Sequence, residues 1–299
     1  MARHVIVTGG DARYFPLLED LAASIRDQAA GAALGLSVID TGLTREQGEH
    51  LARRYGARIL QTGWEFPEAE RRHERPSDKL SVARAFLDRY HPEADLLTWI
   101  DADAWVQDMA PLSGMFGAAE RGRLAIVSQT SRYAQNTMSV QWLSVALGLA
   151  RVRSILYKNG RNAGLPLAVC RRLGAKPTLN AGCFTLARNA PHWDAMRRHM
   201  AVTLRRGRVF TVDQLAIGLA AYMDGLPVEL CPETCNYMGP WRASDDGRTL
   251  VEFYTPYNPV GIVHMAGLDA MRADPSVTME IPMVSGGSLA RSLRRGAWI

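Results

Sequence analysis

The stretch LLTWIDADAWVQDM, residues 96–109, carries two aspartates one residue apart, directly after an apolar run. The run 96–100 has the pattern of a buried strand, where a carboxylate without a partner is strongly unfavourable. Asp101 and Asp103 therefore either begin a solvated turn or face a cation beyond the strand's end. We favour the cation, because alternate residues of an extended segment share a face and hard divalent cations prefer oxygen ligands.

The composition is that of an ordinary globular protein. The chain has 299 residues, 47% of them apolar and 22% charged, which is enough for one large domain or two modest ones. Lys plus Arg number 35 against 30 Asp plus Glu, a mild excess that suits an anionic ligand and does not indicate nucleic-acid binding. The start lacks the apolar core of a signal peptide, and no stretch is long enough to predict a membrane-spanning helix. With 4 cysteines in no pairing pattern, we expect reduced thiols and a cytoplasmic protein.

Strands and helices are predicted to alternate through the first part of the chain. β-Branched and apolar runs predict strands at 4–10, 34–42, 57–63 and 95–100. Apolar residues at helical spacing predict helices at 14–29, 44–56 and 78–94, the second with a threonine cap. This alternation predicts a parallel sheet with right-handed crossovers.

The rhythm changes after the two aspartates. Further strands are expected at 124–129, 178–187, 226–239 and 260–267, and helices at 190–207 and 211–225. His192 and His199 are expected on the exposed face of the first of these helices. Residues 131–178 are expected to hold helical segments and no strand, with the apolar WLSVALGLA at 142–150 as a core or interface helix.

Two common nucleotide-binding motifs are incomplete. The glycines of VTGG, residues 7–10, follow the first strand, but Asp, Tyr and Pro stand where a dinucleotide-binding loop needs further glycines. A phosphate-binding loop of the GxxxxGK[ST] type is absent as well. A nicotinamide enzyme or a P-loop kinase is therefore not expected.

Seven short motifs follow one another along most of the chain. They are DARY (11–14), DKLSVARAFL (78–87), WIDADAWVQD (99–108), LNAGCFTLA (179–187), TVDQLAI (211–217), CNYM (235–238) and IVHMAG (262–267). Their order resembles that of glycosyltransferase family 8, which includes bacterial lipooligosaccharide galactosyltransferases and glycogenin. The resemblance implies an α/β GT-A fold, Rossmann-like, with a mixed, mainly parallel sheet flanked by helices.

The same resemblance implies a domain layout. Residues 1–270 would form one catalytic domain, with a nucleotide-sugar-binding half at 1–110 and an acceptor-side half at 111–270. A basic tail would follow at 271–299.

The resemblance also assigns roles to residues at the donor site. Asp101, Asp103 and His264 would ligate Mn²⁺ or Mg²⁺, and Asp101 would also contact the donor. Asp11 and Tyr14 would hold and stack on the uracil of the nucleotide. Other residues would contact the rest of the donor, namely Lys79, Asn180, Ala181 and Gly267.

Asp213 and Gln214 would stand at the reaction centre. Simpler interpretations remain open for several of these residues: Asp11 and Asp213 also suit the starts of helices, and Lys79 suits a solvated helix face. The chain departs from the family after its histidine, where a Lys-Pro-Trp usually grips the diphosphate. Here HMAGLDAMRADP, residues 264–275, offers Arg272 as the candidate replacement.

The function implied is metal-dependent transfer of a hexose from a nucleotide-diphosphate sugar, foremost a UDP-sugar, with retention. The acceptor would be a saccharide, a lipid-linked saccharide or another hydroxyl compound. Two alternatives stay open. One is a non-catalytic or self-glycosylating nucleotide-sugar-binding protein, for which Tyr254 and Tyr257 are candidate acceptors. The other is a sugar nucleotidyltransferase, which usually carries a basic, glycine-rich loop that GGDARY does not resemble.

The end of the chain, SLARSLRRGAWI at 288–299, is basic and follows a Gly/Ser hinge. It is expected either as a basic, partly disordered terminus or as a short helix. In such a helix Leu289 and Leu293 would share a face, and the segment would make weak contact with the inner membrane surface.

Overall fold

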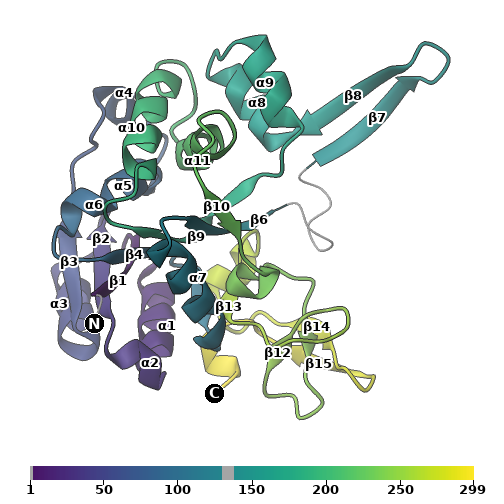
Figure 1. The fold of residues 1–299 in the computed structure, drawn as a ribbon. Coiled ribbons are helices and arrows are strands. Elements are labelled where there is room, and N and C mark those ends of the chain that lie inside the picture. Colours follow the sequence, from purple (N-terminus) through teal and green to yellow (C-terminus); the bar gives the residue numbers. More distant parts are fainter. Residues whose placement is uncertain (1–2, 130–137) are drawn as a thin grey trace.

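A seven-stranded sheet runs through the middle of the molecule (Figure 1). The computed structural model describes residues 3–129 and 138–299, and describes only the backbone at 138–140 and 150–153. The strands of the sheet are β1 (His4–Gly10), β2 (Gly35–Asp40), β3 (Ala57–Gln61), β4 (Leu96–Ile100), β6 (Leu124–Ser128), β9 (Leu179–Ala187) and β10 (Val228–Leu230). Their order is β10-β6-β9-β4-β1-β2-β3. Only β9 runs antiparallel to its neighbours β4 and β6, so the predicted mixed, mainly parallel sheet is confirmed.

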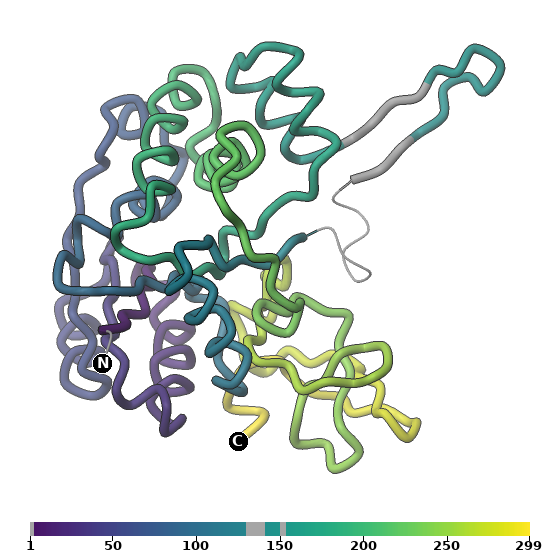
Figure 2. Tube along the Cα trace, in the orientation of Figure 1, coloured from purple at the N-terminus to yellow at the C-terminus, as the bar shows by residue number. Residues whose placement is uncertain are grey.

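Helices cover both faces of this sheet (Figures 1 and 2). One face packs on α1 (Phe15–Arg26), α3 (Arg45–Tyr55) and α7 (Ala110–Glu120) through buried residues such as Leu21, Leu51 and Leu112. The short helix α2 (Ala29–Ala32) follows α1. Thr44 caps α3 together with Gln47, as the sequence predicted.

The other face packs on a second group of helices, with Phe86, Trp193 and Ile217 in the shared core. These are α4 (Pro67–Arg72), α5 (Lys79–Ala83), α6 (Leu87–Tyr90), α10 (His192–Thr203) and α11 (Val212–Tyr222). The predicted helix 78–94 is interrupted: 3₁₀ turns at Pro76–Asp78 and Arg84–Phe86 precede and follow α5. The expected exposure of His192 is wrong, because its side chain is fully buried between α10 and the segment before β10.

A short pair of strands brings the two ends of the candidate metal motif together. After β4, the chain turns through Asp101 and Asp103 into β5 (Ala104–Val106). This strand pairs antiparallel with β13 (Ile262–His264), so that His264 stands opposite Ala104. The pairing explains how a histidine so far along the chain reaches the two aspartates.

The chain after β10 forms a third core beside α1, with Trp105, Tyr237 and Val263 among its buried residues. Its remaining elements are a 3₁₀ turn at Glu233–Asn236, β11 (Arg242–Ala243), β12 (Leu250–Val251), α12 (Asp269–Ala273), β14 (Met279–Pro282), β15 (Ser288–Arg291) and a 3₁₀ turn at Arg295–Ala297. The segment 288–299 is thus neither a partly disordered terminus nor a single helix, so both expectations for the end of the chain are wrong.

The expected Gly/Ser hinge is instead the turn of a hairpin between β14 and β15, in which Gly286 and Gly287 have φ of 104° and 76°. Leu289 lies in a strand, where no helical face exists to share with Leu293. Leu293 is fully buried and Trp298 is only 9% exposed, so neither side chain is available to a membrane. Arg294 pairs with Asp20 of α1 at 2.6 Å, which fastens the segment to the fold.

The expectation of no strand within 131–178 is also wrong, although 131–137 lie outside the described residues. A hairpin of β7 (Met138–Ser144) and β8 (Leu149–Ser154) precedes α8 (Ile155–Asn162) and α9 (Leu167–Gly174). The stretch 142–150, expected as a core or interface helix, belongs to this hairpin instead, and residues 142–149 form its largely exposed end. None of the helices that the structure describes is long and apolar enough to cross a bilayer.

Candidate active site

A cleft of about 570 Å³ opens where the carboxyl ends of β1 and β4 meet the start of β9. Ligands in open α/β sheets bind at this kind of position. Most of the predicted site residues line it, namely Tyr14, Asp101, Asp103, Asn180, Ala181, Asp213, Gln214, His264 and Gly267. The structure therefore brings together residues from nearly the whole length of the chain.

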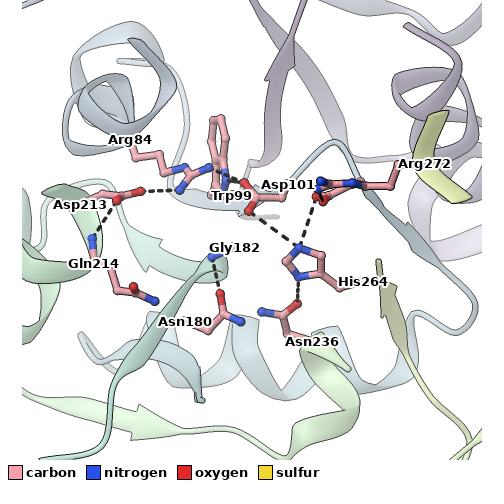
Figure 3. A network of polar contacts seen from close by, with 11 residues as sticks. Arg84, Trp99, Asp101, Asn180, Gly182, Asp213, Gln214, Asn236, His264 and Arg272 are labelled. Atoms are coloured by element: carbon pink, nitrogen blue, oxygen red, sulfur yellow. Dashed lines mark hydrogen bonds and ion pairs between the residues drawn. The ribbon is translucent and has the colours of Figure 1, made fainter. Parts of the chain in front are cut away.

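Asp101, Asp103 and His264 form a compact group that lines this cleft. Figure 3 shows Asp101 and His264 facing each other. Their ligand atoms lie within 4.8 Å of one another. His264 Nε2 is 3.3 Å from Asp103 Oδ1 and 3.9 Å from Asp101 Oδ2. All three residues are mostly buried, so two carboxylates and an imidazole converge where little water can screen them.

Neighbouring residues orient the three side chains. The Nδ1 of His264 lies 2.7 Å from Asn236 Oδ1, which turns Nε2 toward the carboxylates. The backbone N–H of Asp101 donates to Gly182 O at 2.8 Å, and Trp99 Nε1 donates to Asp101 Oδ1 at 2.8 Å. The group is thus held by β4, β9 and the turn before β13 together.

Gly182 leaves the space that this arrangement needs. A Cβ at this position would lie 2.6 Å from His264 Cε1 and 2.8 Å from Asp101 Oδ2. The backbone N–H of Gly182 also donates to Asn180 Oδ1 at 2.8 Å, which brings the Asn180 side chain close to the same position. Glycine at 182 therefore allows the histidine and the first aspartate to approach β9 closely.

Two arginines flank the aspartates. Arg84 bridges Asp101 and Asp213, stacked over Trp99 at 4.5 Å from the ring centre, and Arg272 pairs with Asp103. Burial acts to lower the pKa of Arg84, but the two carboxylates outweigh it and hold the pKa above its ordinary value. Both cations stay charged at the edge of the cleft, where an anionic ligand would meet them.

The pKa values of the two aspartates move in opposite directions. Burial is the main cause that raises the pKa of Asp101, against the pull of Arg84. Burial has the same tendency at Asp103, but His264 and Arg272 outweigh it and hold the pKa of Asp103 well below its usual range. Burial acts to lower the pKa of His264, but the attraction and hydrogen bond of Asp103, together with the attraction of Asp101, outweigh burial and raise this pKa.

Asp213 and Gln214 stand on the opposite wall, at the start of α11 (Figure 3). Asp213 is almost fully buried, accepts the backbone N–H of Gln214 at 2.8 Å through Oδ1, and pairs with Arg84 through Oδ2. Asp213 therefore lies in the first turn of a helix and also lines the cleft, so the two interpretations are compatible. The side chain of Gln214 reaches the cleft lining.

Two predicted residues do not line the cleft. Asp11 caps the turn before α1, accepting the N–H groups of Arg13 at 3.0 Å and Tyr14 at 3.3 Å, and so positions Tyr14, which does line it. Lys79 donates to the carbonyl of Thr62 at 3.1 Å and lies over Trp64, outside the cleft. The basic residue that the same segment brings to the site is Arg84, which the sequence motif did not single out.

No protein-family model and no curated protein sequence matches the chain. Solved structures do resemble it. A complex of galactosyltransferase LgtC with donor and acceptor sugar analogues shares 15% identity over 88% of this chain and 87% of that one, with a TM-score of 0.53. The bifunctional glycosyltransferase WbbM shares 14% identity over 89% of this chain and 46% of that one, with a TM-score of 0.54.

Mouse xyloside xylosyltransferase 1 shares 12% identity over 90% of this chain and 99% of that one, with a TM-score of 0.52. At such identities the likeness concerns the arrangement of the backbone. It confirms the architecture that the motifs predicted: the chain has the GT-A glycosyltransferase fold.

Proposed function

We propose that this chain is a retaining glycosyltransferase that moves a hexose from a nucleotide-diphosphate sugar, foremost a UDP-sugar, to a hydroxyl acceptor. One observation carries the proposal: two carboxylates and an imidazole converge within 4.8 Å inside a cleft of about 570 Å³. The GT-A fold gives this cleft its place at the strand ends. A saccharide or a lipid-linked saccharide is the acceptor class we propose.

The three side chains suit Mn²⁺ or Mg²⁺. Carboxylate oxygens and one imidazole nitrogen are the ligands that such cations accept, and the ligand atoms of the three residues lie within 4.8 Å of one another. Asp101, Asp103 and His264 would hold the ion, and Asn236 would keep the imidazole turned toward it. A bound cation supplies Lewis-acid neutralisation of the diphosphate leaving group.

The chain's own residues supply the rest of the electrostatics. Arg272 and Arg84 place fixed positive charge beside the cleft, which stabilises the negative charge that grows on the diphosphate as the glycosidic bond breaks. Tyr14 offers a ring to the base of the nucleotide, with Asp11 holding its turn. Asn180, Ala181 and Gly267 line the part left for the donor sugar.

Asp213 and Gln214 face the sugar from the other wall. Arg84 and the backbone N–H of Gln214 hold the two oxygens of Asp213, so this carboxylate is fixed before substrate arrives, and Gln214 follows it in the first turn of α11. Their oxygens stand where positive character develops at the anomeric carbon. Tyr254 and Tyr257 are not among the residues that line the cleft, which favours transfer to a separate acceptor over self-glycosylation.

The first prediction is metal dependence. Asp103→Asn removes one ligand charge, so we expect turnover of a nucleotide sugar to be lost and Mn²⁺ binding, measured by calorimetry, to weaken at least about tenfold. The matched control is Asp269→Asn, because Asp269 also pairs with Arg272 but is exposed and outside the ligand group. Full turnover by chelator-treated protein would contradict the metal site.

The second prediction concerns the base. If Tyr14 stacks on a pyrimidine, UDP binds more tightly than ADP or GDP, and Tyr14→Ala weakens UDP binding roughly tenfold or more, the usual worth of base–aromatic stacking. Tyr14→Phe keeps the ring and serves as the control. Calorimetry that ranked a purine nucleotide above UDP would argue against a UDP-sugar donor while leaving the metal site untouched.

A further inference from the structure

The hairpin of β7 and β8 projects from the body of the molecule, and its end lies away from the seven-stranded sheet and the helices that cover it (Figures 1 and 2). In the described part of the chain, 5 of the 11 exposed large hydrophobic side chains belong to this end. They are Trp142 (62% exposed), Leu143 (63%), Val145 (79%), Leu147 (73%) and Leu149 (52%). Monomeric proteins rarely gather apolar side chains in this way without using them.

Packing within the chain does not explain these residues. A two-stranded ribbon has no core of its own and is marginally stable in isolation, so side chains on both of its faces meet water. The helices that follow bury their own apolar residues, such as Leu156 and Leu173, in a separate cluster that includes no residue of the hairpin end. The apolar end of the hairpin therefore belongs to none of the apolar clusters of the described chain.

The charge around the hairpin is of one sign. The sequence from 121 to 193 contains no Asp or Glu, whereas 7 basic residues fall between 151 and 176: Arg151, Arg153, Lys158, Arg161, Arg171, Arg172 and Lys176. The last five lie on or beside α8 and α9 and are exposed. Within the described chain, none of these five forms an ion pair with a carboxylate. We call these five exposed residues the basic face.

We propose that the hairpin end inserts into the interface of an anionic lipid bilayer while the basic face contacts the lipid phosphates. Tryptophan and aliphatic side chains are favoured at the headgroup boundary. Exposed lysines and arginines are drawn to an anionic leaflet, and each adds to the affinity. The apolar side chains of the hairpin end match the headgroup boundary of a bilayer, and the cations of the helices that follow match its anionic phosphates.

The same charges disfavour a second copy of the chain as the occupant. A two-fold dimer through this surface would place the basic face of one protomer close to that of the other. No acidic residue between 121 and 193 is available to offset this repulsion. An anionic bilayer offers the apolar surface and the opposite charge at once.

The proposed membrane surface adjoins the candidate active site. α8 packs against α11, and Asn159 Nδ2 donates to Oγ1 of Thr211, two residues before Asp213, at 3.2 Å. Binding through the hairpin would therefore bring the cleft close to the bilayer. The inference itself stands on exposure and charge alone and does not depend on glycosyl transfer.

Cosedimentation of the full chain with lipid vesicles tests the proposal. We expect binding to vesicles that contain phosphatidylglycerol and much weaker binding to vesicles of phosphatidylcholine alone. The variant Trp142→Ser/Leu147→Ser removes apolar anchors and should reduce the partition coefficient at least about tenfold. Arg171→Gln/Arg172→Gln removes two cations and should reduce it about 30-fold at low salt.

Matched controls alter the same kinds of residue on other surfaces. Val202→Ser removes a side chain that is 49% exposed on α10, and Arg45→Gln/Arg53→Gln removes two exposed cations on α3. Both should bind anionic vesicles like the unaltered protein. Circular dichroism of each variant separates loss of binding from loss of fold.

Three results would overturn the proposal. One is absence of binding to anionic vesicles, and another is equal binding by the hairpin variant and the unaltered chain. The third is a dimer, seen by light scattering without lipid, that the hairpin variant dissociates, since the occupant would then be a second copy.

Discussion

Gly182 is the residue on which the close spacing of the candidate metal group depends. Its φ lies outside the left-handed region, so alanine is allowed by the backbone and excluded by its neighbours alone. In Gly182→Ala the new methyl group would lie 2.6 Å from His264 Cε1, and the imidazole has to move. We expect Mn²⁺ affinity, measured by calorimetry, to fall roughly 10- to 100-fold while the fold persists.

The control for this prediction is Gly114→Ala. Gly114 lies in α7, and a Cβ there meets nothing within 4 Å. Alanine in a helix interior is favoured over glycine by roughly 0.5–1 kcal/mol, so this variant should be slightly more stable and bind Mn²⁺ normally. Unchanged Mn²⁺ affinity in Gly182→Ala would show that the group does not need its present spacing.

The residues of the site were predictable to different degrees. Asp101, Asp103 and His264 could be predicted as a group because their motifs are short and lie at strand ends: the two aspartates come after β4, and His264 is the last residue of β13. Arg84 was missed, and Lys79 was chosen, because the direction of a helical side chain depends on helix phase. The interruption of this segment by 3₁₀ turns before and after α5 changes that phase in a way that residue spacing does not reveal.

At the scale of the element, the first strands and helices were predicted well because each signal is local. Each β-branched run and each amphipathic helix can be recognised from the residues of that one segment alone. The β7–β8 hairpin was missed for the opposite reason. A short apolar run is ambiguous between a helix and a strand, and the expectation that its residues are covered, in a core or at an interface, favoured a helix.

His192, at the start of α10, predicts a pH dependence of stability. Its Nε2–H donates to Pro227 O at 3.0 Å, and its Nδ1 has no hydrogen-bond partner among the described residues. Burial therefore lowers the pKa of His192 in the folded protein. In the unfolded chain a histidine binds a proton below about pH 6.5, whereas in the folded protein His192 stays neutral to lower pH. The contribution of neutral His192 to the free energy of unfolding is therefore complete above that pH and is lost as pH falls toward the folded pKa.

The slope for this one group is at most about 1.4 kcal/mol per pH unit. Calorimetric Tm values between about pH 7.5 and pH 5.5 should fall more for the unaltered protein than for His192→Gln, which cannot take up the proton. The comparison of the two pH trends cancels other titrating groups. Parallel trends would mean that His192 is accessible to protons in the fold.

At the scale of the whole molecule, the third core could not be predicted from local pattern. It is assembled from Leu17, Trp105, Val263 and Leu293, which come from opposite ends of the chain. Nothing near Leu293 or Trp298 in the sequence indicates a partner, so a short basic segment with scattered apolar residues resembled a surface tail. Only the path of the chain back to α1 and β5 makes these residues part of the core.

This assembly leads to the last prediction. Trp105 Nε1 donates to Leu293 O at 2.8 Å, Trp298 Nε1 donates to Ser292 O at 2.8 Å, and Arg294 pairs with Asp20. Trp298→Ala would leave a cavity between the C-terminal segment and the third core. We expect it to cost about 3 kcal/mol of unfolding free energy. For a chain of this size that corresponds to a decrease in Tm of about 6–12 °C.

A chain ending at Ser285 should lose more, because it also lacks β15 and the buried Leu293. It would expose Trp105 and leave its indole N–H without the carbonyl of Leu293, so we expect it to be insoluble or to unfold well below the unaltered protein. The control is Ile299→Ala, since Ile299 is 82% exposed and its loss should leave Tm unchanged. If the shortened chain kept the full Tm, the C-terminal segment would make no contribution to the stability of the fold. Its stabilising contacts predict instead that the third core closes only when the end of the chain is in place.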